Sequence, residues 1–224
     1  MEGVRLITEY LCWFFQINIS NVVITKYSNL VDPVAVIDWV IRRQNKLECL
    51  MIESKKAERT SDKTARDILS KINHSANVLI NFDLSPNFKT SLKFEGKLLK
   101  IRNGHWFTLD NLFSVNCSIL NVKRTFLDVG DMNEFLKHWI ASDLKFKEIN
   151  IKMTEVISDA LFSEIEFVKQ PKDVERVYKS YDGLTTIYGG YDIQRNDGLW
   201  ATIDSNRFEE SIDFRMIIWD EQEQ

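Results

Sequence analysis

The chain has 224 residues, with 29 Lys or Arg against 33 Asp or Glu, and a formal net charge of −4. Hydrophobic residues make up 44%, which is ordinary for a soluble globular protein, and the length suffices for one sizeable core. A slightly acidic chain has no global basic field for nucleic acid, and no run of about 18 apolar residues predicts a membrane span. We therefore expect neither a nucleic acid nor a membrane as partner.

One apolar pattern recurs along the chain: an apolar residue, two of any kind, a second apolar residue, one of any kind, and a third apolar residue. The good copies cover residues 19–24, 47–52, 117–122 and 146–151. Weaker copies end at Ile101 and at Phe82, the latter with Ile80 in its middle slot. The final apolar positions lie 19 to 30 residues apart, near the period of about 20–29 residues of leucine-rich repeats.

The segments between these expected strands have helical spacing and N-cap residues. Asp32 precedes Pro33, which suits the first helical position. The other expected caps are Ser61 or Asp62, Thr108, and a capping box formed by Asp131 and Glu134. Each strand–helix unit has an apolar side that it cannot bury alone, so stacking of the units is expected.

From about residue 178 the pattern changes to strands alone, expected over 188–193, 199–203 and 212–219. The run Asn196–Asp197–Gly198 predicts a hairpin turn between the first two, because Asp-Gly accepts positive φ angles. The sequence predicts an α/β fold: a leucine-rich-repeat-like stack of strand–helix units over 1–176, with a C-terminal antiparallel β-hairpin cap and an acidic tail over 177–224. We expect the two parts to form one continuous domain.

In each repeat strand, the residue between the last two apolar positions faces the opposite side of the sheet, as does the residue after the last one. In stacked repeats that side is the open surface where partners bind. The later repeats place basic and amide side chains there, and we predict a partner-binding face made of Lys100, Arg102, Asn121, Lys123, Asn150 and Lys152. Such lysines can also simply solvate a sheet face; the functional interpretation is a groove for an acidic or polar peptide.

No pattern of catalytic or metal-binding residues stands out. The three histidines are scattered, and no Cys-x-x-Cys, His-Glu-x-x-His, phosphate-binding glycine loop or Gly-x-Ser-x-Gly motif is present. We expect no enzyme activity and no cofactor, although an unrecognised hydrolase stays open because carboxylates are plentiful. The three cysteines are expected to be core thiols of a reducing compartment, and Trp13, Trp39 and Trp139 to be core residues.

The sequence also resembles a known family, the F-box-associated region of the expanded nematode F-box proteins. The resemblance is carried by residues 37–44, 106–117, 133–139 and 192–203, including the turn Arg195-x-Asp197-Gly198. It implies the substrate-recognition region of an SCF-type, cullin-based ubiquitin ligase receptor that holds a protein target for degradation in the cytoplasm or nucleus.

An F-box needs a few dozen residues ahead of the repeats, and only 18 residues precede Ile19. The resemblance therefore leaves out the F-box itself, which argues against contact with a Skp-type adaptor and a cullin. The alternative is a truncated, F-box-less product that is inert or competes for targets.

Overall fold

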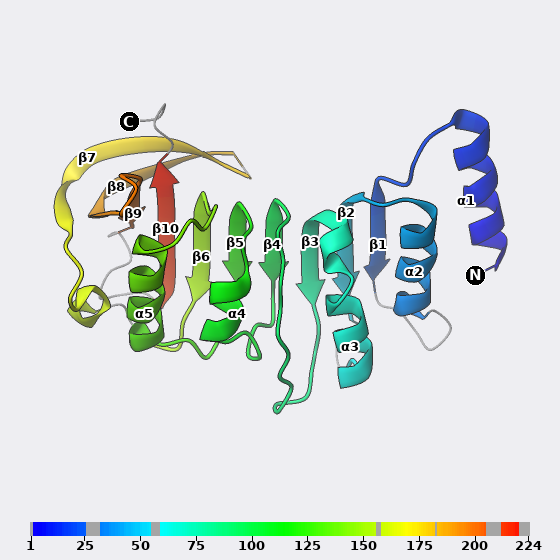
Figure 1. The fold of residues 1–224 in the computed structure, drawn as a ribbon, viewed down its shortest axis with the longest axis horizontal. Coiled ribbons are helices and arrows are strands. Elements are labelled where there is room, and N and C mark those ends of the chain that lie inside the picture. Colours follow the sequence, from blue (N-terminus) through cyan, green and yellow to red (C-terminus); the bar gives the residue numbers. More distant parts are fainter. Residues whose placement is uncertain are drawn as a thin grey trace. The chain divides into compact units, whose positions relative to one another are not determined.

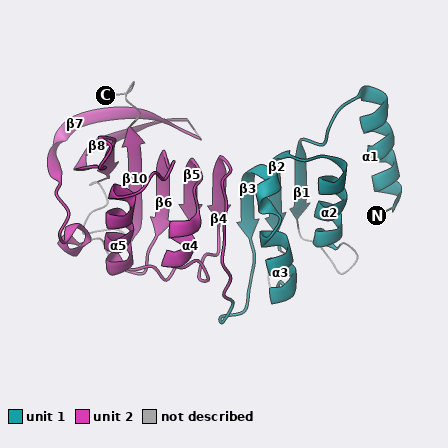
Figure 2. Ribbon diagram, viewed as in Figure 1, with its two compact units in different colours: residues 1–88 teal, residues 89–224 magenta. Residues whose placement is uncertain are grey.

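The computed structural model describes residues 2–25, 32–54, 59–155, 158–181, 183–204 and 212–219. The expected acidic tail lies outside these residues. The chain forms two compact units, residues 1–88 and residues 89–224 (Figure 2). Each unit is an α/β arrangement, and each is described by itself.

The first unit has three parallel strands with helices in their connections (Figure 1). In chain order its elements are α1 (Glu2–Phe15), β1 (Asn21–Thr25), α2 (Pro33–Arg43), β2 (Leu47–Glu53), α3 (Asp62–Leu69), the 3₁₀ turn η1 (Ile72–His74) and β3 (Ser75–Asn81). The strands keep one register, because Ile24 pairs with Ile52 and Ile52 pairs with Ile80. Ile80, not Phe82, therefore occupies the last slot of the third copy, so the expected register there was wrong by two residues.

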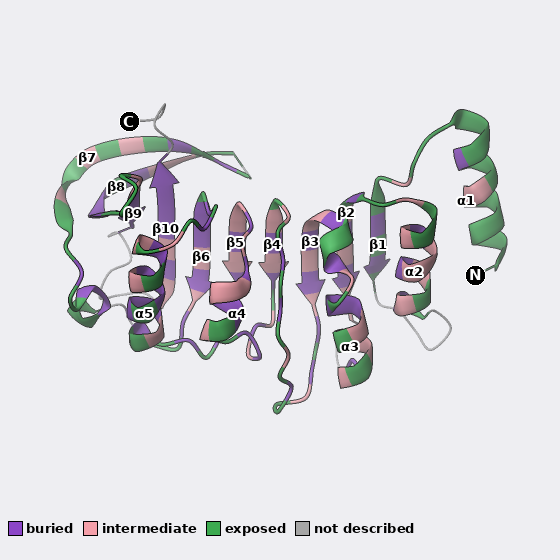
Figure 3. Cartoon of the chain, viewed as in Figure 1, coloured by how far each residue is buried: buried purple, intermediate pink, exposed green. Residues whose placement is uncertain are grey.

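Helix α1 precedes the first strand, where the sequence predicts no element. Its Glu9 carboxylate accepts a hydrogen bond of 2.8 Å from the Trp39 indole of α2, and its Cys12 is buried. Most of the remaining apolar side chains of α1 are exposed (Figure 3). Trp13 is 66% exposed, so the expectation that it is a core residue is wrong, whereas Trp139 is fully buried as expected.

The second unit continues the strand–helix alternation and ends in antiparallel strands. Its elements are β4 (Leu98–Ile101), α4 (Leu109–Ser114), β5 (Ile119–Val122), α5 (Val129–Ile140), β6 (Glu148–Lys152), the 3₁₀ turn η2 (Asp159–Phe162), β7 (Val168–Ser180), β8 (Gly183–Gln194), β9 (Trp200–Ile203) and β10 (Asp213–Trp219). Strands β4, β5 and β6 are parallel neighbours. Strand β10 then joins β6 antiparallel, and β9, β8 and β7 follow in that order.

The apolar residues of β4, β5 and β6 alternate as the sequence predicts. Leu99, Leu120 and Ile149 align across the three strands and are fully buried. Helices α4 and α5 occupy the connections that link β4 to β5 and β5 to β6 (Figure 1). Burial of apolar side chains at about 25 cal/mol per Å² is the main stabilising contribution of this layer.

The predicted caps are mostly confirmed. Asp32, Ser61 and Thr108 each accept a hydrogen bond from a backbone N–H in the first turn of α2, α3 and α4. The predicted box of Asp131 and Glu134 is wrong: Asp128 is the N-cap of α5, and Asp131 occupies the third helical position of a reciprocal capping box. The apolar face of α5 begins one residue after Asp128, which places the cap three residues earlier than the expected one.

The C-terminal antiparallel strand group is confirmed, with one long strand that the sequence does not predict. Strand β7 has 13 residues and bends over β8, β9 and β10 (Figure 1). Its register against β8 breaks between Gln170 and Glu175, opposite the glycine pair Gly189 and Gly190, whose φ angles are 64° and 123°. Glycines suit this irregularity, since positive φ is open to glycine at little cost. The predicted boundary between the repeat region and the C-terminal cap, between residues 176 and 177, falls inside strand β7. The division of the chain into these two parts stays a prediction.

Candidate functional site

The polar face predicted from the later repeats is assembled by strand register in the second unit. Lys100 pairs with Asn121, Asn121 with Asn150, and Asn150 with Arg215 of the antiparallel strand β10. Because residues in register point to the same side of a sheet, these four side chains form one row. The row is half-buried rather than fully exposed.

Four of the six predicted residues line one cavity of about 320 Å³. They are Asn121, Lys123, Asn150 and Lys152. The same cavity is lined by residues that were not predicted, among them Glu148 of β6 and, from the C-terminal strand group, Tyr181, Thr185, Asp213 and Arg215. The site is therefore a hollow between the repeat strands and the C-terminal strand group.

The other two predicted residues lie at the margin. The Lys100 ammonium donates a hydrogen bond of 3.3 Å to the Tyr181 hydroxyl and lies 5.5 Å from the centre of the Tyr181 ring. Arg102 follows the last residue of β4 and is exposed, and it does not line the cavity. Lys100 thus joins β4 to the tip of the β7–β8 hairpin, while Arg102 extends the basic surface outward.

The β7–β8 hairpin folds back over the polar face. Ser180, at the end of β7, donates a hydrogen bond of 2.5 Å from Oγ to Oε2 of Glu148 in β6. Two residues earlier, Tyr178 accepts a hydrogen bond from the Arg215 guanidinium. The antiparallel C-terminal strand group that the sequence predicts lies beside β6. The hairpin additionally covers part of the face, which converts an open surface into a cavity.

Glu148 is the polar centre at the base of the cavity. Its side chain is 4% exposed and accepts hydrogen bonds from Ser180, from Asn150 at 2.7 Å, and from Arg215 at 3.5 Å. A buried carboxylate is tolerated when hydrogen bonds and a cation surround it. The negative charge of Glu148 is therefore paired inside the fold, and the lysines carry the positive charge at the edge of the cavity.

Tyr178 reports the same buried environment. Burial raises the pKa of its hydroxyl to about 12, the neighbouring Glu148 adds to this increase, and hydrogen bonds with Ser180 and Arg215 act in the opposite direction. The Arg215 guanidinium lies 5.2 Å from the centre of the Tyr178 ring. Tyr178 thus stays neutral at physiological pH and supports Arg215 as a hydrogen-bond acceptor rather than as a source of charge.

The alternation of the strands offered a signal for three unpredicted residues. Glu148 lies two residues before Asn150 on β6, and Asp213 and Arg215 occupy alternate positions of the expected strand 212–219. Pairing that strand with β6 would have placed all three on the predicted face. Tyr181 and Ser180 are brought to the site by a hairpin whose position depends on contacts about 30 residues away in the chain, and no local pattern indicates them.

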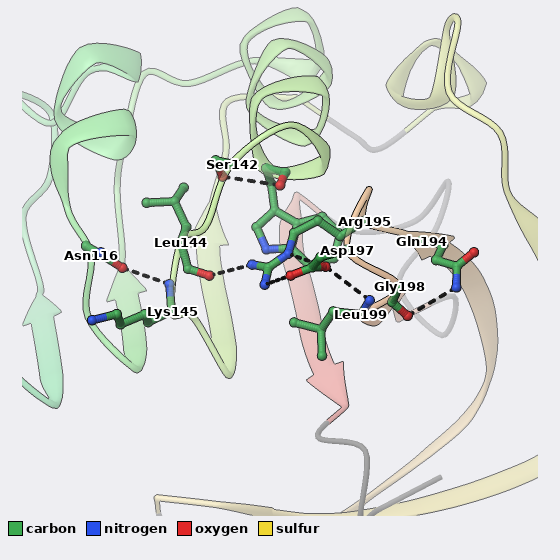
Figure 4. A network of polar contacts seen from close by, with 10 residues as sticks. Asn116, Ser142, Leu144, Lys145, Gln194, Arg195, Asp197, Gly198 and Leu199 are labelled. Atoms are coloured by element: carbon green, nitrogen blue, oxygen red, sulfur yellow. Dashed lines mark hydrogen bonds and ion pairs between the residues drawn. The ribbon is translucent and has the colours of Figure 1, made fainter.

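The turn Arg195-x-Asp197-Gly198 has a structural role. The Arg195 guanidinium makes two hydrogen bonds to the Asp197 carboxylate, at 2.9 and 2.6 Å, and a third, at 2.7 Å, to the backbone carbonyl of Leu144 ahead of β6 (Figure 4). It also lies 5.5 Å from the centre of the Trp139 ring of α5. The hairpin turn is confirmed, with Gly198 at φ 96°, and it fastens the C-terminal strands to α5 instead of forming part of the cavity.

Neither metal-binding clusters nor membrane helices were found in the described parts of the chain. Within those residue ranges, no three or more His, Cys, Asp or Glu side chains gather closely enough to hold a metal ion. No described helix is both long enough and apolar enough to cross a membrane. Cys12 and Cys117 are buried and Cys49 is partly buried, and burial raises the pKa of the Cys117 thiol to about 12.

Comparison with known families bears on the same region. Residues 80–152 match a family model described as F-box associated. The resemblance to the F-box-associated family is confirmed over this segment. The F-box-associated segment contains residues 106–117 and 133–139, two of the four stretches that carried the resemblance, and all six predicted partner-binding residues. A search of the curated proteins and a search of the solved structures each gave no significant match.

Proposed function

We propose that this chain is a protein-binding module in which the polar cavity of the second unit takes an acidic segment of a protein target. The observation that carries the proposal is the coincidence of two independent results. Four residues chosen from the repeat pattern line one cavity, and that cavity is built by strands of the F-box-associated segment together with the C-terminal strand group. A family associated with F-boxes is consistent with holding a target rather than transforming one.

Charge favours an acidic partner. The lining residues include three basic side chains, Lys123, Lys152 and Arg215, and two acidic ones, Glu148 and Asp213. Glu148 is buried and paired, whereas Lys123 is exposed at the mouth. Lys100 and Arg102 extend the basic surface beside it. A carboxylate approaching the mouth therefore meets ammonium groups first, and complementary charge of this kind raises association rates and selects partners.

The proposal also covers the repeat architecture of the module and its place in a ubiquitin ligase receptor. The aligned strands, with buried apolar residues on one side and polar residues on the other, support a leucine-rich-repeat-like stack that presents its polar side to partners. We place the module as the substrate-recognition part of an SCF-type ubiquitin ligase receptor, acting inside the cell without catalysis of its own.

Peptide selection followed by charge reversal tests the acidic-partner proposal. Randomised twelve-residue peptides are selected on the purified protein, and the enriched peptides are measured by fluorescence anisotropy. We expect enrichment of Asp and Glu and binding that weakens as salt rises. The double variant Lys123→Glu/Lys152→Glu should weaken binding by about tenfold or more, since several kcal/mol can separate attraction from like-charge repulsion.

The matched control reverses two exposed lysines that do not line the cavity, Lys145→Glu and Lys172→Glu. This variant has the same change in net charge, so a general electrostatic effect would weaken binding equally in both. Equal losses in the two variants, or selected peptides without acidic enrichment, would show the proposal to be wrong. The ligase assignment has its own test, which is co-purification of the full natural protein with a Skp-type adaptor.

A further inference from the structure

A second cavity lies within the C-terminal strand group, apart from the polar cavity. It has a volume of about 490 Å³ and is lined by Val168, Gln170, Arg176, Val177, Asp192 and the two tryptophans Trp200 and Trp219. Trp200 and Trp219 are register partners on β9 and β10, so their indoles lie side by side. This size is in the range of about 300–1,000 Å³ that is typical of binding pockets.

Arg176 and Asp192 of this cavity are paired with each other, although Nε of Arg176 is buried without a hydrogen-bond partner among the described residues. Asp192 accepts hydrogen bonds from Arg176 at 3.0 and 3.1 Å, from Gln170 at 2.8 Å and from Thr202 at 2.5 Å. Arg176 also donates to the backbone carbonyl of Gly189 at 3.0 Å. A carboxylate or phosphate ligand would have to displace Asp192 from this network, which disfavours an anion.

The rest of the lining favours an aromatic group. The Trp219 indole N–H donates to Thr202 at 2.8 Å, so the ring requires no polar partner from a ligand. The guanidinium of Arg176 lies 5.3 Å from the centre of the Trp219 ring, and it is a planar cation of the kind that stacks on aromatic faces. The indoles of Trp200 and Trp219 and the planar guanidinium of Arg176 line the cavity together. Such a surface suits an aromatic ring of a ligand better than a branched aliphatic side chain.

The rim is apolar, although most of the other residues of β7 are polar or charged. Val168 and Val177 are 52% and 54% exposed, and both line the cavity. Exposed apolar side chains around a pocket are a recognised mark of a binding site.

The second cavity is connected to the polar cavity by a stack of four side chains. Arg215, which lines the polar cavity, lies over the ring of Tyr178. The Tyr178 ring meets Trp219 edge-on at 6.4 Å between centroids, and Arg176 lies over Trp219. No described residue lines both cavities, and this stack of side chains links the second cavity to the polar one.

We infer that the second cavity binds an aromatic side chain of the protein target, whose acidic segment occupies the polar cavity. The identity of the occupant rests on the proposed function, whereas the preference for an aromatic group rests on the cavity alone. Interfaces commonly combine a buried aromatic anchor with a charged rim, and the anchor then contributes most of the affinity.

Nuclear magnetic resonance tests the cavity with N-acetyl-L-phenylalaninamide as the probe and N-acetyl-L-leucinamide as the comparison. We expect the indole N–H signals of Trp200 and Trp219 to shift with a dissociation constant of the order of 1 mM, a typical affinity for so small a ligand. The leucine compound should bind about tenfold more weakly. Equal binding of the two compounds, or no shift with the aromatic one, overturns the aromatic preference.

Substitution at the rim provides the matched pair. Val177→Lys places a charge at the mouth and should weaken probe binding about tenfold, and Val168→Lys is the second variant should the first fail to fold. Leu184→Lys is the control, because Leu184 is 77% exposed on β8 and does not line the cavity. An unchanged affinity in both rim variants places the probe elsewhere and overturns the inference.

The peptide selection separates this inference from the proposed function. We expect an aromatic residue in the enriched acidic peptides. Val177→Lys should remove the aromatic preference and keep the acidic one, and Lys123→Glu/Lys152→Glu should do the reverse. Acidic peptides without aromatic enrichment overturn the occupant alone. Concentration-dependent dimerisation that Val177→Lys abolishes identifies a second copy of the chain as the occupant and equally overturns it.

Discussion

The Ser180 hydroxyl donates a 2.5 Å hydrogen bond to the Glu148 carboxylate, across 32 residues of sequence. Both side chains are buried, one at the end of β7 and the other at the start of β6. This contact ties the β7–β8 hairpin to the sheet face that it covers. The polar cavity exists because the hairpin is held there.

Loss of either partner should destabilise the protein unequally. Ser180→Ala removes one of several hydrogen bonds to Glu148 and should lower the free energy of unfolding by about 1–3 kcal/mol. Glu148→Ala leaves Arg215 without its buried counter-charge and should cost about 3–5 kcal/mol. Urea unfolding measures both. Glu164→Ala is the control, because that carboxylate is exposed and its ion pair with Lys137 should contribute little; a loss in Ser180→Ala no larger than in this control would contradict the role of the contact.

Asp197 should titrate in unusually acidic solution. Hydrogen bonds from Arg195 hold the pKa of its carboxyl at about 2, below its usual value of 3.8. A depressed folded-state pKa contributes stability that is present above the unfolded value and is lost as pH falls from about 4 to about 2. The carboxyl carbon signal, followed by nuclear magnetic resonance, should have its midpoint near 2. In Arg195→Gln the midpoint should move back toward the usual value, and an unmoved midpoint would exclude Arg195 as the cause.

Two tryptophans that share an apolar sequence context should differ sharply on truncation. Trp139→Ala removes a fully buried ring of α5 and should cost about 3–5 kcal/mol of unfolding free energy. Trp13→Ala, on the exposed side of α1, should change it by about 0.5 kcal/mol or less. Thermal and urea unfolding of the two variants provide the comparison, and similar losses would mean that Trp13 is covered in solution.

Gly190 should not tolerate even one methyl group. A Cβ at this position would lie 2.5 Å from a Thr202 methyl group and 2.9 Å from the Ile203 carbonyl oxygen, and the residue has φ 123°. Gly190→Ala should therefore lower the unfolding free energy by about 1–3 kcal/mol through overpacking and backbone strain. Gly3→Ala is the matched control, since a Cβ at Gly3 would have no atom of the described chain within 4 Å, and it should be neutral or slightly stabilising. A Gly190→Ala variant as stable as the parent would contradict the close packing of β8 on β9.

Local physics explains which features could be predicted from the sequence. The apolar alternation of the repeat strands determines which side chains are buried, because a strand exposes successive residues to opposite faces. Asp32, Ser61 and Thr108 indicate where helices begin, because their side chains accept hydrogen bonds from backbone N–H groups of the first helical turn. The Asp197–Gly198 turn follows from the backbone freedom of glycine. The same alternation places Asn121, Lys123, Asn150 and Lys152 on one face, because each occupies the same alternate position of its strand.

Tertiary structure alone decided the rest. The bend of β7 over the polar face, the burial of Glu148 beneath Ser180 and the aromatic cavity beside Trp219 all depend on contacts between residues far apart in the chain. Such contacts are set by the packing of whole elements, which apolar periodicity does not encode. Trp13 is an example in which the local pattern misleads. Its apolar sequence neighbours predict a buried residue, but no described element covers its side of α1, and Trp13 is 66% exposed.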